Sequence, residues 1–431
     1  MKFALVNPPW TFDGSIYFGC REPHLPVEYG YARALLERDG HEVLLLDAQL
    51  YELSLADVAA RLAAFAPDRL VITTAPSYLF WRCPPPELRV PQELLAACAH
   101  VPSLRIVVGP HASTTPVATL HKLGADVAVL GECEEILPRL AADPLQWAGV
   151  PSIAYSRDGD LHVQGTSHVC DMSALPALEW TRHDLARHRH HHGFDNRPSR
   201  PGAEMEVSRG CPYHCTFYAK DNFRDDYRRR PLDVILTELD GLLGNGVEYV
   251  YFIDEIFVPN RELLEALVPR AVRFGIQTRI DLWNPENLEL LGRAGCVSME
   301  AGVSITLEGR NLLDKGSRLT TERIASRLIA AKQHVPFVQA NLVESAVDDP
   351  VEVERWREHL RRYGVWANRP VPRFSYPGSP GYARVWGMPD DRAWERAMEE
   401  YLARFDEFSA VQGPRPSPLH KLERARSSPR A

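Results

Sequence analysis

Short apolar segments alternate with amphipathic helical segments along the first 150 residues of the chain. The apolar segments are predicted to be strands at 2–7, 41–47, 69–74, 104–109 and 126–130, and helices are predicted at 27–39, 55–65, 91–99 and 114–123. Continuous apolar strands separated by helices are typical of a parallel sheet that helices cover on both faces. The sequence therefore predicts a doubly wound, flavodoxin-like α/β domain over residues 1–150.

A doubly wound sheet binds its ligands beyond the carboxyl ends of its strands. Glycine and small polar residues follow several of the predicted strands, so these ends leave room for a large, flat ligand. The candidates for ligand contact are Pro9, Ser77, Gly109, His111, Gly131 and Glu132. His111 either faces the ligand or hydrogen-bonds the backbone of its loop. No G-x-G-x-x-G fingerprint follows the first strand, which disfavours NAD or FAD.

The alternation resumes after an irregular stretch rich in Pro, Arg and His, which is expected to be a connector over 151–203. Strands are predicted at 204–209, 249–254, 277–283, 297–303, 337–344 and 366–371, with helices at 232–243, 261–274, 285–294, 322–334 and 351–363. This pattern predicts a partial (β/α)6 barrel over 204–385, with its chemistry at the carboxyl ends of the strands. A C-terminal helix over 386–412, packed over the barrel, and a disordered tail over 413–431 are expected to follow.

Polar residues are frequent in the predicted barrel strands, whose inward positions are normally filled by branched aliphatic side chains. They include Asp254, Glu255, Arg279, Asp281, Glu300, Gln339, Asn341 and Asn368. Buried polar groups need partners, so these residues either bind a polar ligand or pair with each other, as Arg279 could with Asp281 or Glu300. The sequence favours a ligand.

A cysteine loop follows the first predicted barrel strand. Cys211 and Cys215 have the spacing of the first two ligands in a C-x-x-x-C-x-x-C iron–sulfur loop, and Tyr218 occupies the third ligand position. Thiolates are the usual ligands of such clusters, although a tyrosine phenolate also binds iron in some proteins. Either Tyr218 or a ligand from outside the loop completes the ligand set, or the cluster is lost or incomplete. Most of the other cysteines are expected to be reduced residues of the core or of loops; the six are Cys20, Cys83, Cys98, Cys133, Cys170 and Cys296.

This loop, and the chain from about residue 1 to 400, resembles the radical S-adenosylmethionine (SAM) enzymes that carry an N-terminal cobalamin-binding domain. The resemblance implies a 4Fe–4S cluster on Cys211, Cys215 and Tyr218, with one iron left open to chelate SAM. It also implies that Phe217 lies against the SAM adenine. Asp254 and Glu255 match the place that holds the methionyl amino group, and Glu300 begins the fourth-strand segment of the SAM site. That segment lacks the glutamate that the family often carries there.

The same resemblance implies that cobalamin binds at the strand ends of the first domain, without a D-x-H-x-x-G motif. It implies C-methylation of a small metabolite in secondary metabolism, in which methylcobalamin supplies the methyl group and a deoxyadenosyl radical removes a substrate hydrogen. A reductant protein would then be a partner. Two alternatives remain open: a cluster-free cobalamin enzyme with non-radical chemistry, and an inactive partner subunit of an active paralogue.

The composition excludes several other classes of protein. A net charge of −8 argues against a nucleic-acid binder held by phosphate contacts. No apolar run reaches the roughly 18 residues of a membrane helix, and the N-terminus leads directly into a predicted strand, so a cytoplasmic protein is expected. The histidines at 188 and 190–192 lack partners at fixed spacing, which favours a polar loop over a metal site.

Overall fold

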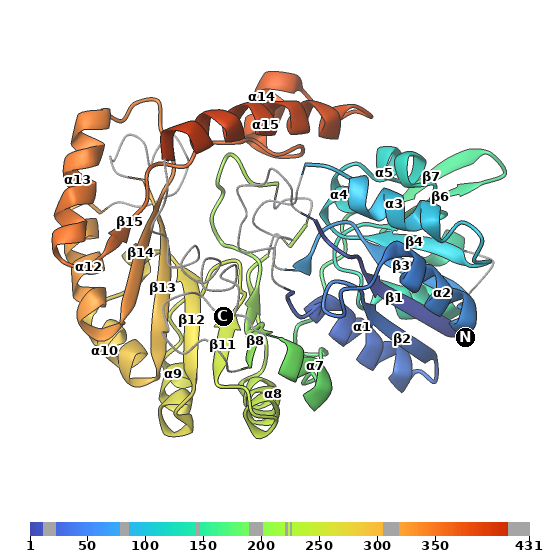
Figure 1. Cartoon of the computed structure of the whole chain (residues 1–431), viewed down its shortest axis with the longest axis horizontal. Helices are drawn as coiled ribbons and strands as arrows, with labels where there is room; N and C mark the ends of the chain where they lie inside the picture. Colours follow the sequence, from blue (N-terminus) through green and yellow to red (C-terminus); the bar gives the residue numbers. More distant parts are fainter. Residues whose placement is uncertain are drawn as a thin grey trace, which may run out of the picture. The chain divides into compact units, whose positions relative to one another are not determined.

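The computed structural model describes residues 1–11, 23–77, 86–142, 147–188, 201–219, 223–224, 226–304 and 319–412, the last eight by their backbone only (Figure 1). The chain forms two compact units. The first unit comprises Met1–Trp180, Phe217–Val234 and Ser375–Leu402. The second comprises Thr181–Thr216, Ile235–Phe374 and the chain from Ala403.

The first unit is built on a seven-stranded sheet of order β2-β1-β3-β4-β5-β6-β7. Its parallel strands are β1 (Lys2–Asn7), β2 (Glu42–Asp47), β3 (Arg69–Thr73), β4 (Leu104–Val108) and β5 (Val127–Val129). The helices are α1 (Val27–Arg38), α2 (Leu55–Phe65), α3 (Arg89–Ala97), α4 (Pro110–Thr114), α5 (Pro116–Leu123) and α6 (Ile136–Ala142). Because alternate residues of the strands enter two separate hydrophobic clusters, the sheet is buried on both faces. The predicted flavodoxin-like domain is confirmed, and its strand order reverses between β1 and β3.

The expected connector is wrong in its first part. Strands β6 (Ile153–Arg157) and β7 (Asp160–Gln164) extend the first sheet as an antiparallel hairpin. Asp158 and Gly159 both have positive φ angles, 53° and 88°, which is the geometry of a tight type I′ turn. The Asp-Gly pair was therefore the available sequence signal for this hairpin. Helix α7 (Arg182–Arg187) follows, with the Thr181 side chain capping its N-terminus.

The second unit contains a six-stranded parallel sheet of order β15-β14-β13-β12-β11-β8. The strands are β8 (Gly202–Met205), β11 (Tyr249–Phe252), β12 (Arg273–Thr278), β13 (Cys296–Val303), β14 (Phe337–Leu342) and β15 (Trp366–Ala367). The helices between them are α8 (Leu232–Gly244), α9 (Arg261–Leu267), α10 (Pro285–Arg293), α12 (Thr321–His334) and α13 (Pro350–Arg362). Figure 1 shows a curved sheet with α9, α10 and α12 along one side, so the predicted partial barrel is confirmed.

The third barrel strand was predicted four residues too late, at 277–283, because the preceding helix was expected to run to residue 274. Helix α9 ends at Leu267 and a single 3-10 turn, Val268–Arg270, follows. Pro269 in this turn has no backbone N–H to continue the helix, and Ala271 adopts a left-handed conformation with φ 51°. The helix therefore ends here, and β12 begins two residues later, at Arg273.

The C-terminal helix forms, but its first turns belong to the first unit rather than to the barrel. In α15 (Ala393–Gln412), the Trp394 Nε1 donates a hydrogen bond to Thr115 Oγ1 at 2.7 Å, and Glu395 pairs with Lys122 of α5. A helix that was not expected, α14 (Pro380–Trp386), precedes it and is capped by Ser379. Within the described residues, no helix combines the length and the apolar character needed to cross a bilayer.

Candidate functional site

The cysteine loop presents the accessible thiols of the described chain. Cys211 and Cys215 are partly exposed, whereas Cys98, Cys133, Cys170 and Cys296 are buried, and none of the six forms a disulfide within the described residues. Burial raises the pKa of the Cys98 thiol to about 11 and raises that of Cys296 further, which keeps both protonated and inert. These four residues are the reduced core cysteines that were predicted; Cys20 and Cys83 lie outside the described residues.

Two acidic side chains at the end of β11 hold the segment that leads into this loop. Asp254 accepts hydrogen bonds from the Val207 N–H, at 2.9 Å, and from the Ser208 hydroxyl. Glu255 accepts one from the Gly210 N–H at 2.8 Å. Burial raises the pKa of Asp254 well above its usual range, although both hydrogen bonds oppose this shift. Asp254 and Glu255 therefore position the loop, and their expected contact with SAM remains a prediction.

Tyr213, the middle residue between the two cysteines, anchors the loop to the segment that follows β12. The Arg279 guanidinium lies over the Tyr213 ring, 3.9 Å from its centroid. Arg279 also donates two hydrogen bonds to Asp281, at 3.0 and 2.7 Å. The structural pairing of Arg279 with Asp281 that the sequence allowed is thus formed. Arg279 also interacts electrostatically with Cys215, so a positive charge compensates the thiolate that metal binding requires.

The third ligand position is aromatic and only partly covered. Tyr218 is partly exposed, and its ring lies 4.3 Å from that of the buried Phe217, inclined by 50°. The backbone oxygen of Phe217 accepts a hydrogen bond from the Tyr376 N–H at 3.3 Å. Phe217 is therefore fixed by the fold. Its expected contact with an adenine and the expected iron ligation by Tyr218 remain predictions.

One face of the second sheet carries a row of polar side chains at matching register. Gln277, Glu300 and Gln339 are direct neighbours on β12, β13 and β14. Asn341 donates to Glu300 at 3.1 Å and accepts from Gln339. The intervening positions, which face the other side, are the fully buried Ile276, Met299 and Val338. This sheet therefore combines an apolar face with a polar one, which suits the binding of a polar ligand.

The strand order of the first sheet brings the residues predicted to contact cobalamin to the same edge of the sheet. Pro9, Ser77, Gly109 and Gly131 follow β1, β3, β4 and β5, which are consecutive neighbours in the sheet. Ser77, Gly109 and Gly131 nevertheless make contacts within the protein itself. The Ser77 hydroxyl donates to Glu28, a fully buried residue of α1 whose pKa burial raises to about 7. Glu28 has no distinguishing signal in the sequence, because an acidic residue in a first helical turn is an ordinary feature.

His111 and Gly131 have structural roles that the sequence did not reveal. His111 is completely buried, and its ring centroid lies 4.2 Å from that of Trp394. Gly131 has a φ of +82°, and a Cβ at this position would lie 2.3 Å from the backbone oxygen of His168. The close approach that Gly131 permits is therefore made by the chain itself, and its expected contact with cobalamin remains a prediction.

Glu132 is held by Arg228, which lies 96 residues further along the chain. Arg228 donates to both carboxylate oxygens, at 2.5 and 3.1 Å, and the Cys170 N–H donates to the same group at 3.1 Å. Arg228 also donates to the Cys170 backbone oxygen at 2.6 Å. Glu132 thus joins three separate segments, and its expected contact with cobalamin remains a prediction.

Comparisons with known proteins agree with this architecture. No family model matches the chain. The sequence is 22% identical over 404 residues to an uncharacterized methyltransferase of Pyrococcus horikoshii, covering 90% of this chain and 82% of the relative. It is 26% identical over 352 residues to the anaerobic magnesium-protoporphyrin IX monomethyl ester cyclase of Synechocystis, covering 78% and 67%.

Two solved structures have the same fold over most of the chain. One is the radical SAM methyltransferase TsrM of Kitasatospora setae with cobalamin and a [4Fe-4S] cluster, at a TM-score of 0.69 and 17% identity, covering 89% of this chain and 74% of that chain. The other is the cobalamin-dependent SAM radical enzyme OxsB, at a TM-score of 0.72 and 16% identity, covering 98% and 70%. The fold is that of the cobalamin-dependent radical SAM enzymes. In this radical SAM fold, β8 is the first barrel strand and the loop with Cys211 and Cys215 follows it.

Proposed function

We propose that this chain is a cobalamin-dependent enzyme of the radical SAM type that transfers a methyl group to a carbon of a small metabolite. The observation that carries the proposal is the pair of accessible thiols, Cys211 and Cys215, after the first strand of a parallel sheet with a polar face. The relatives support the reaction class, because one is named a methyltransferase and TsrM has also been solved with tryptophan as its substrate.

The residues present fit the three cofactors to different degrees. Two partly exposed thiols on one loop suit an iron–sulfur cluster, and the polar row around Glu300 suits SAM. We assign both to the barrel over 204–385, and cobalamin to the domain over 1–150, where the strand order reverses at β1 and β3. When bound, cobalamin would supply the methyl group and the cluster with SAM would supply the means to activate the substrate carbon.

Residues of the chain itself position the cysteine loop and balance its charge. Asp254 and Glu255 fix the backbone before Cys211, so the loop keeps one conformation. Arg279 holds Tyr213 and offsets the negative charge of a Cys215 thiolate. Such preorganisation is what a protein contributes when cofactors carry the chemistry. A reductant protein is the expected partner if the cluster assembles.

Tyr218 favours a second candidate function. A phenolate is a harder ligand than a thiolate, and two thiolates alone make a labile cluster site. We therefore keep a non-radical cobalamin enzyme, which transfers a methyl group by polar chemistry, as the alternative. An inactive partner subunit of an active paralogue is the third possibility that the Tyr218 position allows.

Anaerobic reconstitution with iron, sulfide, SAM and cobalamin separates these functions. We expect bound iron and cleavage of SAM in the native chain, and loss of both in the Cys211→Ala/Cys215→Ala variant. Cys296→Ala is the matched control, because Cys296 is buried at the amino end of β13, the opposite end of the sheet from the loop. Bound cobalamin without iron would favour the non-radical enzyme. Neither cobalamin nor iron in the native chain would contradict the proposal.

A further inference from the structure

A second group of metal-ligating side chains lies in the first unit, on the segments that Gly131 brings together. The segment after β5 carries Glu134 and Glu135, and the segment after β7 carries His168 and Cys170. Two backbone hydrogen bonds lock these segments: the His168 N–H donates to Leu130 O at 2.8 Å, and the Glu132 N–H donates to His168 O at 3.0 Å. The juxtaposition is therefore built into the backbone.

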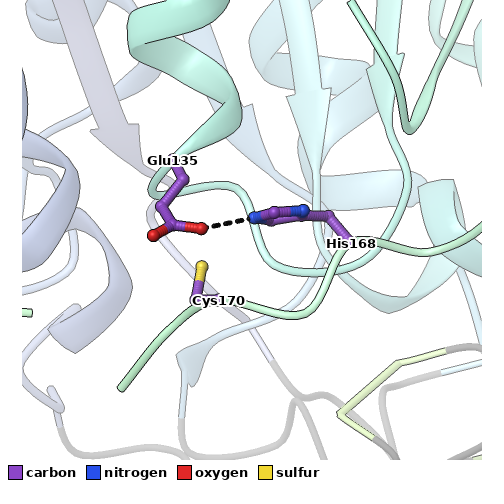
Figure 2. Close-up of side chains that lie close together, drawn as sticks. All are labelled: Glu135, His168 and Cys170. Carbon is purple, nitrogen blue, oxygen red and sulfur yellow. Dashed lines mark hydrogen bonds and ion pairs between the residues drawn. The ribbon is translucent and has the colours of Figure 1, made fainter. Parts of the chain in front are cut away.

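The donor atoms converge on one point. Figure 2 shows the Glu135 carboxylate directed at the His168 ring, with the Cys170 sulfur close to both. The His168 Nε2 lies 2.7 Å from Glu135 Oε2, and the imidazole, carboxylate and sulfur ligand atoms all lie within 4.8 Å of one another. The Cys170 sulfur also lies 3.5 Å from Glu134 Oε2.

These separations are close to those of a zinc site. Bond lengths of about 2.3 Å to sulfur and about 2.0 Å to nitrogen or oxygen in a tetrahedron place sulfur and oxygen ligands about 3.5 Å apart, and nitrogen and oxygen ligands about 3.3 Å apart. His168 and Glu135 need to separate by about half an ångström for a metal to enter between them.

The local charges select a dication. Glu132 is compensated by Arg228, as described above, and does not need a metal. As metal ligands, the Cys170 thiolate and the Glu135 carboxylate would contribute two negative charges and the His168 imidazole none, which a divalent ion balances. A thiolate with an imidazole favours zinc over magnesium or calcium, which prefer oxygen ligands alone.

We propose that Glu135, His168 and Cys170 form a zinc-binding site that is distinct from the cysteine loop and independent of the proposed function. On binding, the Cys170 thiol releases its proton to solvent and the sulfur bonds the ion, while His168 binds through Nε2 and keeps its proton on Nδ1. A water molecule takes the fourth position. The ion would clamp the segment that follows β5 to the segment that follows β7.

The test must separate this site from the loop thiols, which also bind metals. The full-length Cys211→Ala/Cys215→Ala variant is therefore the background, stripped with a chelator and then titrated with Zn²⁺ or Co²⁺ alone. We expect one Zn²⁺ per chain and a thiolate-to-cobalt charge-transfer band. Adding Cys170→Ala should abolish the band, and His168→Gln or Glu135→Gln should weaken Zn²⁺ binding by more than about 100-fold, since losing even an outer partner of a ligand costs 10–100-fold.

Matched controls are available in the same unit. Cys98→Ala removes another buried thiol, and His162→Gln removes an exposed imidazole on β7, and neither change should affect the binding of Zn²⁺ or Co²⁺. If Cys170→Ala does not fold, the two glutamine variants decide the result. The proposal is overturned if the background variant binds no Zn²⁺, or if the charge-transfer band persists without Cys170 or binding is unchanged by both glutamine variants. The three side chains would then be a metal-free ion pair beside a thiol.

Discussion

Replacing Gly131 by alanine tests the close approach on which the first unit's strand ends depend. The new Cβ would lie 2.3 Å from the His168 backbone oxygen and 2.4 Å from its nitrogen, both of them backbone atoms that cannot rotate away. This clash is relieved only if the segment around His168 moves, and that movement breaks its two backbone hydrogen bonds to Leu130 and Glu132. The φ of +82° adds backbone strain.

The expected cost follows from these losses. A left-handed conformation costs a residue with a Cβ about 1–2 kcal/mol, and two hydrogen bonds contribute about 1 kcal/mol each. Gly131→Ala should therefore lower the free energy of unfolding by about 3–4 kcal/mol. Gly124→Ala is the control, because Gly124 also has a positive φ, +58°, but nothing lies within 4 Å of its Cβ position. It should cost only the strain, about 1 kcal/mol.

Thermal unfolding of the two variants and the native chain measures the difference. At about 2–4 °C per kcal/mol for a domain of this size, Gly131→Ala should lower the midpoint of the first unit by about 10 °C and Gly124→Ala by about 3 °C. Equal shifts for the two variants would refute the reasoning, because they would show that the contact with His168 contributes nothing.

Three further changes have defined outcomes. Arg228→Met should lower the free energy of unfolding by about 3–5 kcal/mol, because it leaves the fully buried Glu132 carboxylate uncompensated. Adding Glu132→Gln should recover part of this loss, as measured by urea unfolding. If the destabilisations of the two single variants simply add in the double variant, Arg228 and Glu132 are not energetically coupled. Glu28 has a folded-state pKa raised to about 7, so its contribution to stability is present below pH 4.5 and is lost as the pH rises through 7. Glu28→Gln should therefore remove up to about 3 kcal/mol of the stability loss between pH 5 and pH 8, and parallel pH profiles for the two proteins would rule this out. Tyr218→Cys should increase bound iron after anaerobic reconstitution, and unchanged iron content would show that this position is not a ligand position.

The elements that were predicted best are those whose burial pattern is unambiguous. Strand β1 and helix α2 begin and end at the predicted residues. In β1 the whole segment is apolar, and in α2 an amphipathic pattern follows a capping serine, so both boundaries are marked in the sequence. The errors arise where local signals compete. Strand β12 begins earlier than predicted because Pro269 ends the preceding helix, and the hairpin of β6 and β7 was hidden in a segment rich in polar residues.

The candidate site was only partly predictable for a different reason. Cys211 and Cys215 lie close in the sequence, so their spacing alone identifies them. Arg228 lies 96 residues from its partner Glu132, and His168 lies 33 residues from Glu135, so no local pattern connects them. The His-x-Cys pair at 168–170 and the Cys-Glu-Glu run at 133–135 were the available signals, but only the fold brings them together.

Cofactor stoichiometry tests the proposed function most directly. Iron, sulfide and cobalamin should be measured per chain in anaerobically reconstituted protein, together with its optical spectrum. We expect about one cobalamin per chain and bound iron, with the iron lost and the cobalamin retained in Cys211→Ala/Cys215→Ala. Failure of the native chain to take up cobalamin in any oxidation state would contradict the proposed function.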